Sequence, residues 1–195
     1  MADHSLQYRS ALAGSPATGE LPLRLHRMEL SELPVDCVLV AAYAGSPDIA
    51  PSIARIAGVA APGAPGLASI SGPVSMMPIA PDTWQIATAP GTGTALAFAL
   101  KSELGSLAAV TDLSFGRIVA IALCGDDSHV VLEKGIGIDF SDVAFATGRV
   151  VATGLHAVHV LIVKTAPGSF HILVPRSFAL SILEWLVDAI EEFKA

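Results

Sequence analysis

The apolar residues of this chain come in short runs that proline and glycine interrupt. There are 13 Pro and 17 Gly among 195 residues, although 52% of the residues are hydrophobic. The longest apolar stretch, 87–100, contains Pro90, Gly91 and Gly93, and Lys101 follows it directly. A membrane-spanning helix needs about 20 predominantly apolar residues. We therefore expect no membrane span, but a fold of short strands and helices around a substantial hydrophobic core.

In the first half of the chain, the pattern predicts strands separated by two helices. The run at 37–40 is continuously apolar, which is typical of a buried strand. Asp48 can cap a helix in which Pro51 falls in the first turn, and Gly105 is suited to end a second helix. The predicted elements are a strand at 36–43, a helix through 49–56, a loop at 58–66, a hairpin of 74–79 and 83–89, and a helix from Thr92 or Thr94 to 104.

The second half repeats this order of elements. Its most regular element is the last helix, where Phe178 and Trp185 belong to an apolar face at helical spacing. A short helix is expected between Asp127 and Lys134, because acidic side chains favour the amino end of a helix. The predicted strands lie at 117–123, 149–153, 157–164 and 169–174.

The repeated order predicts an α+β fold of two small lobes. Each lobe is expected to hold a short antiparallel or mixed sheet with helices packed on one face. We place the first lobe at 21–108 and the second at 109–195. Residues 1–20 are rich in Ala, Ser, Gly and Pro, without periodicity, and are expected to form a disordered tail. They lack the apolar core of a signal peptide, so we expect a cytoplasmic protein.

The charge of the chain disfavours some partners and favours others. The formal net charge is −7, and 15% of the residues are charged. An acidic chain with scattered Lys and Arg is not expected to bind nucleic acid. A charge-poor surface is what a subunit contact requires, so the composition favours a protein that assembles with other chains.

Residues of the types used in hydrolysis and metal binding are present, but not in a recognisable arrangement. Asp112, Ser114 and His129 supply the types of a catalytic triad, yet no serine lies in the G-x-S-x-G motif that places a nucleophile on a strained turn. His156 and His159 stand three apart in a strand-like run, and alternation sends them to opposite faces. We therefore expect no catalytic residue and no metal ligand in this chain.

Two further features contain residue types that occur in binding sites. Gly91-Thr92-Gly93 precedes a helix, where a phosphate would bind. The third glycine and the strand–helix–strand context of a dinucleotide site are missing, so a turn or helix cap is expected, and no cofactor-binding residue. Cys37 and Cys124 lack the close spacing of a metal site and are expected to be buried free thiols.

Several segments, in this order and spacing, resemble one family. Residues 110–117 read V-T-D-L-S-F-G-R and 132–135 read L-E-K-G, with Asp139 next; 174–178 read V-P-R-S-F and 184–186 read E-W-L. They resemble the gamma subunit of heterotetrameric sarcosine oxidase, and the V-P-R-S-F and E-W-L segments are the most specific. The segment 77–86, with Asp82-Thr83-Trp84, is similar to a hairpin of that family. The resemblance covers most of the chain and is strongest after Val110.

The resemblance implies a fold distantly related to the folate-binding aminomethyltransferase of the glycine cleavage system. It also implies a place beside alpha, beta and delta subunits in a complex that demethylates sarcosine oxidatively to glycine. Such a complex passes the one-carbon unit to tetrahydrofolate and forms hydrogen peroxide. FAD, FMN, NAD and tetrahydrofolate would then bind to the partner subunits, and this chain would contribute packing rather than catalytic groups.

Within that family, we expect structural or interface roles for Asp112, Arg117, Pro175, Arg176, Ser177 and Trp185. Two positions depart from the family pattern: Phe115 stands where His is usual, and 135–139 read G-I-G-I-D rather than G-C-P-L-D. These departures leave the substrate open, and two alternatives remain. One is the small subunit of a related N-methyl amino acid oxidase or dehydrogenase. The other is a free-standing folate-binding module, for which Asp112 and Asp139 are the candidate acids for the pterin ring.

Overall fold

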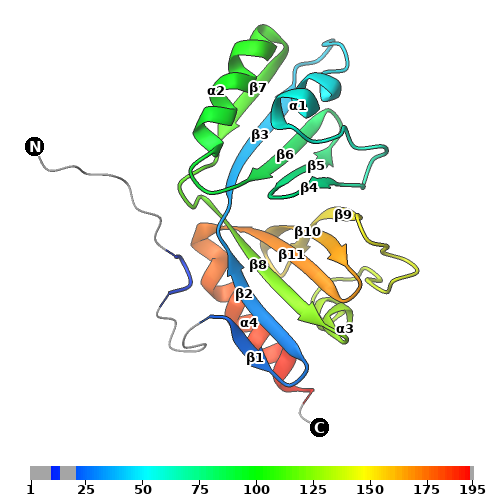
Figure 1. Cartoon of the computed structure of the whole chain (residues 1–195). Helices are drawn as coiled ribbons and strands as arrows, with labels where there is room; N and C mark the ends of the chain where they lie inside the picture. Colours follow the sequence, from blue (N-terminus) through cyan, green and yellow to red (C-terminus); the bar gives the residue numbers. More distant parts are fainter. Residues whose placement is uncertain (1–9, 14–20, 194–195) are drawn as a thin grey trace, which may run out of the picture.

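Residues 10–13 and 21–193 are described here from a computed structural model of the chain. Within these ranges the chain forms two sheets, each with helices on its outer face (Figure 1). One sheet has six strands in the order β1-β2-β8-β11-β10-β9, and the other has five in the order β4-β5-β6-β3-β7. Every pairing between neighbouring strands is antiparallel. The predicted α+β class, with two lobes, is confirmed.

The elements agree with the predicted ones to within a few residues, but four strands were not predicted: β1, β2, β4 and β7. The strands are β1 (Leu23–Leu25), β2 (Met28–Leu33), β3 (Asp36–Ala42), β4 (Ser69–Ser71), β5 (Val74–Ala80), β6 (Thr83–Thr88), β7 (Ala108–Asp112), β8 (Ile118–Gly125), β9 (Val150–Leu155), β10 (Val158–Ala166) and β11 (Ser169–Pro175). The helices are α1 (Ala50–Ala57), α2 (Gly93–Leu104), α3 (Ser128–Glu133) and α4 (Ala179–Glu191), with 3-10 turns at Gly105–Leu107 and Arg176–Phe178.

Two helix ends lie close to the residues predicted for them, although the residue at the N-cap of α1 is Ile49 and not Asp48. Asp48 Oδ1 accepts the Ala50 N–H at 3.0 Å, where α1 begins. Gly105 follows the last residue of α2 with φ at +51°, a conformation that glycine adopts without steric cost. One further residue differs from the prediction. Phe178 lies in the 3-10 turn before α4 and is 46% exposed, so it is not part of the buried face of that helix.

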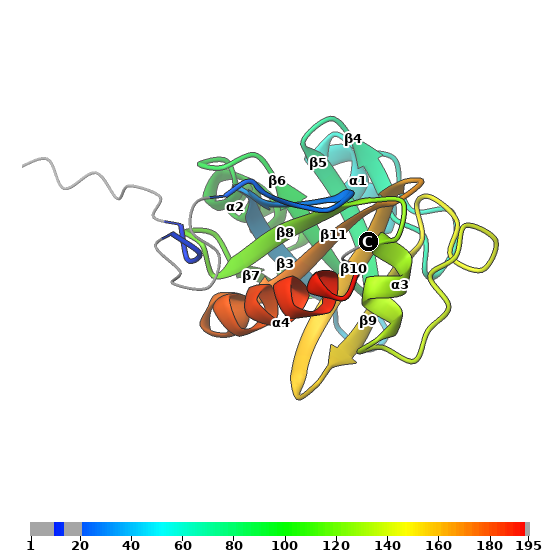
Figure 2. The ribbon, with the colours of Figure 1, turned by 90° about the horizontal axis from the view of Figure 1, so that it is seen from below.

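The two lobes stack as four layers: helices, sheet, sheet and helices. In β3, Val38 packs toward α1 and α2, while its neighbour Cys37 packs toward the other sheet. In β8, Ile121 packs toward α4 and Ala120 toward the first sheet. Figure 2 shows α3 and α4 lying across one face of the six-stranded sheet. Because the central strands are covered on both faces, their sequences are continuously apolar.

The chain crosses between the lobes twice, and each crossing exchanges one strand (Figure 1). β2 pairs with β8 in the six-stranded sheet, and the chain then enters the five-stranded sheet as β3. β7 pairs with β3, and the chain then returns to the six-stranded sheet as β8. The orders β4-β5-β6-β3-β7 and β9-β10-β11-β8-β2 therefore correspond position by position. The molecule therefore consists of two units with the same strand order. The first strand of each unit, β2 or β7, pairs in the sheet of the other unit.

This exchange divides the chain differently from the lobes predicted at 21–108 and 109–195. Residues 23–33 belong to the sheet of the second lobe, and β7 extends the first lobe to residue 112. Of the predicted tail, residues 1–9 and 14–20 lie outside the described residues. Leu12 is described and is 1% exposed in the core of the second lobe, so the prediction of a disordered tail is wrong for residues 10–13.

Candidate functional site

The two crossings meet at a buried carboxylate, Asp36, the first residue of β3. Its Oδ2 accepts the N–H groups of Gly91 at 2.8 Å and Gly93 at 3.1 Å, and its Oδ1 accepts the Phe115 N–H at 3.3 Å. One side chain thus ties the start of α2 to the second crossing. Sequence reasoning missed Asp36. The available signal was an acidic residue placed directly before a continuously apolar strand.

Asp36 also explains why Gly91-Thr92-Gly93 is not a phosphate site. The backbone N–H groups that would hold an anion at the start of α2 are bonded to this carboxylate instead. A Cβ added to Gly93 would lie 2.6 Å from the Asp36 Cβ and 2.1 Å from the Ser114 Oγ. The predicted turn role of this segment is confirmed, and Gly93 is required by the close approach of the second crossing.

Asp112 ends β7 on the other side of the same junction. Its Oδ1 accepts the Ser114 N–H at 2.9 Å, and its Oδ2 accepts the hydroxyl of Thr94 in α2 at 2.8 Å. Partial burial opposes ionisation, but the hydrogen bonds from Ser114 and Thr94 and the charge of Lys101 hold the pKa of Asp112 below its ordinary value. Asp112 therefore stabilises the turn of the second crossing.

Exposed aromatic side chains surround this junction. Phe115 is 65% exposed, and Phe98, one turn after Thr94 in α2, is 74% exposed. Arg176 donates its backbone N–H to the Arg117 carbonyl oxygen at 3.0 Å, which brings the turn before α4 to the same place. Five of the six predicted interface residues lie at this junction: Asp112, Arg117, Pro175, Arg176 and Ser177. We call the junction face the set Phe98, Asp112, Phe115, Arg117, Arg176, Ser177, Phe178 and Leu180.

The sixth predicted residue, Trp185, lies elsewhere. It is half-buried on α4, and its ring meets the His156 ring edge to face, with centroids 5.8 Å apart. A Cβ added to Gly135 would lie 2.6 Å from the indole ring. Trp185 therefore packs α4 against the turn after α3 and the turn between β9 and β10.

The residue types considered for catalysis do not come together. Ser114 precedes β8 and His129 follows it, and a strand of eight residues spans about 26 Å. Burial raises the pKa of the Cys37 thiol to about 12, so it stays protonated at neutral pH. Among residues 10–13 and 21–193, no cluster of His, Cys, Asp and Glu has the geometry to hold a metal ion.

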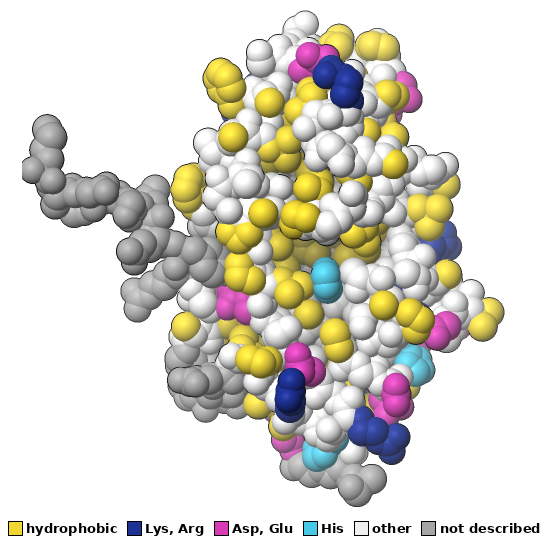
Figure 3. Space-filling view, in the orientation of Figure 1, with side chains coloured by type: hydrophobic (Ala, Val, Ile, Leu, Met, Phe, Trp, Pro, Cys, Tyr) yellow, Lys and Arg dark blue, Asp and Glu magenta, His cyan; other side chains and the backbone are white. Residues whose placement is uncertain are grey.

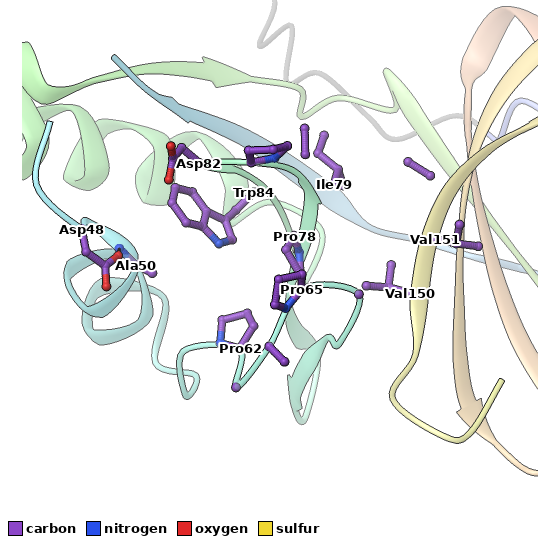
Figure 4. Close-up of a pocket in the computed structure, with 16 residues that line it drawn as sticks. Asp48, Ala50, Pro62, Pro65, Pro78, Ile79, Asp82, Trp84, Val150 and Val151 are labelled. Atoms are coloured by element: carbon purple, nitrogen blue, oxygen red, sulfur yellow. Dashed lines mark hydrogen bonds between the residues drawn. The ribbon is translucent and has the colours of Figure 1, made fainter. Parts of the chain in front are cut away.

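Two hollows lie between the lobes. The larger, about 750 Å³, is bounded by Asp48, Asp82 and Trp84 on one side and by Val150 and Val151 of β9 on the other, with prolines between them (Figure 4). The smaller, about 250 Å³, is lined by apolar side chains and by His171. Figure 3 shows apolar side chains in the hollowed waist between the two lobes. Burial lowers the pKa of His171, so its imidazole is neutral at pH 7.

The fold and this site define a class of protein. The two-lobed architecture matches the glycine cleavage system aminomethyltransferase T of Bartonella henselae, with a TM-score of 0.60 at 15% identity over 83% of this chain and 45% of that chain. That likeness concerns the fold alone. In the described part of the chain no helix is long and apolar enough to cross a membrane. The chain is an α+β protein of aminomethyltransferase-like fold in which the residue types weighed for catalysis lie apart.

Closer similarities identify the family. The model of the sarcosine oxidase gamma subunit family matches residues 41–192. The gamma subunit of sarcosine oxidase from Corynebacterium sp. (strain U-96) is 33% identical over 149 residues, which are 74% of this chain and 70% of that protein. The one from Arthrobacter sp. is 35% identical over 124 residues, 63% of this chain and 55% of that protein.

A solved structure agrees with these alignments. Heterotetrameric sarcosine oxidase from Corynebacterium sp. U-96, in complex with pyrrole 2-carboxylate, matches with a TM-score of 0.76 and 28% identity, covering 86% of each chain. The chain belongs to the sarcosine oxidase gamma subunit family.

Proposed function

We propose that this chain is the non-catalytic gamma subunit of a heterotetrameric sarcosine oxidase. The observation that carries the proposal is the family match over residues 41–192, together with the structural match to a chain of a heterotetrameric sarcosine oxidase. The complex would demethylate sarcosine oxidatively to glycine, transfer the one-carbon unit to tetrahydrofolate and form hydrogen peroxide. Its alpha, beta and delta subunits would carry FAD, FMN, NAD and tetrahydrofolate, and its location would be the cytoplasm.

The geometry supports a structural role for this subunit. The carboxylates of Asp36 and Asp112 at the lobe junction accept hydrogen bonds from the chain itself, while the side chains of Phe98 and Phe115 face solvent. An enzyme site has the opposite character, with polar groups that converge on an open pocket. Exposed aromatic and arginine side chains are typical anchors of protein contacts. We infer that the junction face docks on a larger subunit, and that Arg117, Arg176 and Ser177 lie in that contact.

Co-expression with the three other subunits tests this function. The expected result is a stable complex that contains this chain and the flavin-bearing subunits, and that forms hydrogen peroxide from sarcosine. Co-expression without this chain should reduce the yield or stability of the complex. If the wild-type chain elutes apart from the flavoprotein, the proposal is wrong. If the complex oxidises another N-methyl amino compound and not sarcosine, the small subunit of a related oxidase or dehydrogenase is the correct assignment.

Phe178→Ser tests the junction face, with Val143→Ser as a matched control. Both residues are exposed and apolar, at 46% and 97%, but Val143 lies in the loop before β9, outside the junction face. Phe178→Ser should weaken assembly about tenfold or more, as expected when an aromatic anchor is truncated. Val143→Ser should leave it unchanged. Equal behaviour of the two variants would refute the placement of the contact.

The isolated chain distinguishes the remaining alternative. Titration with a tetrahydrofolate derivative should give no saturable binding, because Asp112 is engaged with Ser114 and Thr94. Asp139 likewise accepts the Ser141 N–H at 2.9 Å. Saturable binding would favour a free-standing folate-binding module.

A further inference from the structure

β9 is an edge strand with the composition of an interior strand. It forms the end of the six-stranded sheet and pairs only with β10. Its sequence, V-V-A-T-G-L, contains no charged residue and no proline. The other end strands are protected: β1 and β4 have three residues each, and β7 is covered by α2. Proteins commonly protect exposed edges with charge, proline or short length, and β9 has none of these.

One isolated bridge joins the residue before β9 to the loop before β4 on this outer edge. Val150 donates its N–H to the Gly66 carbonyl oxygen at 2.9 Å, and Ala68 donates to the Gly148 oxygen at 2.8 Å, around the bridge of Leu67 with Arg149. Upstream of Gly66, the segment 62–65 turns away, because Leu67 donates its N–H back to the Ala64 oxygen. The pairing therefore stops after one bridge.

The rest of this edge is open. In an antiparallel pair the hydrogen-bonding groups of successive residues alternate between the two sides of a strand. Since the Val150 N–H points away from β10, the N–H and C=O groups of Ala152 and Gly154 also point away from β10. Both residues are exposed. The edge therefore offers two backbone donors and two acceptors in register for an extended segment.

The larger hollow lies beside this edge, and its lining indicates which side chains such a segment would carry. Its walls are Trp84, Pro62, Pro65 and Pro78, which suit apolar side chains (Figure 4). At the far end stand Asp48 and Asp82, both exposed and without an ion pair to any described residue. Two carboxylates favour a basic side chain at that end.

We propose that β9 receives an extended segment of a partner subunit as an added strand. This segment pairs with Ala152 and Gly154, places apolar side chains in the hollow, and directs a Lys or Arg toward Asp48 and Asp82. The inference rests on the proposed function, because it takes the partner from the sarcosine oxidase complex. Main-chain pairing supplies the affinity of this binding mode, and the pockets for alternate side chains supply its specificity.

Ala152→Pro tests the added strand, with Ala152→Ser as the matched control. Proline removes the outward N–H of Ala152 and leaves the ladder with β10 intact, whereas serine keeps the donor and nearly the size. In the co-expressed complex, Ala152→Pro should weaken binding of this chain about tenfold or more. Ala152→Ser should bind as wild type does. The melting temperature of the full-length chain alone should be similar for both variants.

Hydrogen exchange on the wild-type proteins gives an answer that does not depend on the variants. The amides of Ala152 and Gly154 should exchange quickly in the chain alone and slowly in the complex. If the complex forms while these amides stay fast and Ala152→Pro assembles normally, the added strand is wrong and the proposed function stands. If the wild-type chain does not join a complex at all, the proposed function itself fails. Protection of the same amides in the chain alone, with dimerisation, would show that a second copy occupies the edge and would overturn the partner segment.

Discussion

Asp36→Ala is expected to lower the free energy of unfolding of the chain by about 3 kcal/mol. The side chain is 6% exposed and accepts three backbone N–H groups. The Gly93 N–H is buried, and a buried donor left without an acceptor costs about 1–3 kcal/mol. Gly91 and Phe115 are exposed residues, so water can replace the carboxylate at their N–H groups, and each loss costs about 0.5–1 kcal/mol.

Two variants bracket this expectation. Asp36→Asn keeps the shape and one acceptor oxygen but places an amide donor against backbone donors, so its cost should be intermediate. Asp112→Ala is the control at the same junction. It removes the acceptor of the Ser114 N–H and the Thr94 hydroxyl at a half-buried position, which should cost about 1 kcal/mol.

Urea unfolding followed by tryptophan fluorescence measures these differences in each lobe separately. The chain has two tryptophans, Trp84 in the first lobe and Trp185 in the second. Because Asp36 joins both crossings, single-tryptophan versions should report the same loss of stability from either lobe. The reasoning is refuted if Asp36→Ala costs no more than Asp112→Ala, or if only Trp84 reports the change.

Trp185→Ala should destabilise the chain by about 2–3 kcal/mol, below the range for a fully buried tryptophan because the indole is half-buried against Gly135; an unchanged melting temperature would contradict its packing. Iodoacetamide should label Cys124 in the folded chain long before Cys37, because Cys37 is fully buried with a pKa of about 12. Equal labelling rates would mean that the first sheet opens readily. Burial lowers the pKa of His171 in the folded chain. Below pH 6.5, the unfolded chain therefore binds a proton at this residue more readily than the folded chain does. The stability that the chain has above pH 6.5, the ordinary pKa of histidine, should therefore be lost as the pH falls through the lower pKa of the folded chain. In His171→Leu, the urea midpoint of unfolding should depend less on pH in that range. An unaltered profile would count against this assignment.

Local chemistry in the sequence was sufficient for most elements, because helix ends and buried strands carry their own signals. Asp48, Gly105 and the run at 37–40 each marked an element that the structure contains. Strand β2 was missed although Met28 and Leu30 are buried and alternate with less buried neighbours. Its partner β8 lies about 90 residues away, and no local pattern reports a pairing over that distance.

The division into lobes failed for the same reason. A repeated order of elements predicts two units, but it does not say which unit receives the first strand of each. The exchange of β2 and β7 depends on contacts between distant segments, and on the short links at 34–35 and 113–117. Of the residues that form the junction face, the resemblance had singled out Asp112, Arg117, Arg176 and Ser177. Its aromatic members were not singled out, because the exposure of Phe98 on α2 and of Phe178 in the 3-10 turn before α4 depends on which faces of these elements pack against the sheets.

The exchange and the role of Asp36 are consistent with the structural role proposed for this aminomethyltransferase-like fold. Strand ends and the start of a helix are places where such folds can gather polar groups around a ligand. In this chain, side chains of the protein itself bind at those places. Asp36 accepts hydrogen bonds at the start of α2. Lys164, which is 1% exposed, contacts Asp142 and the Phe140 carbonyl oxygen over the other sheet. Lys134 likewise joins α3 to the end of α4. Asp36 joins the two crossings, and the two lysines stabilise the second lobe. The exposed aromatic groups near the junction, Phe98 and Phe115, favour contact with another protein.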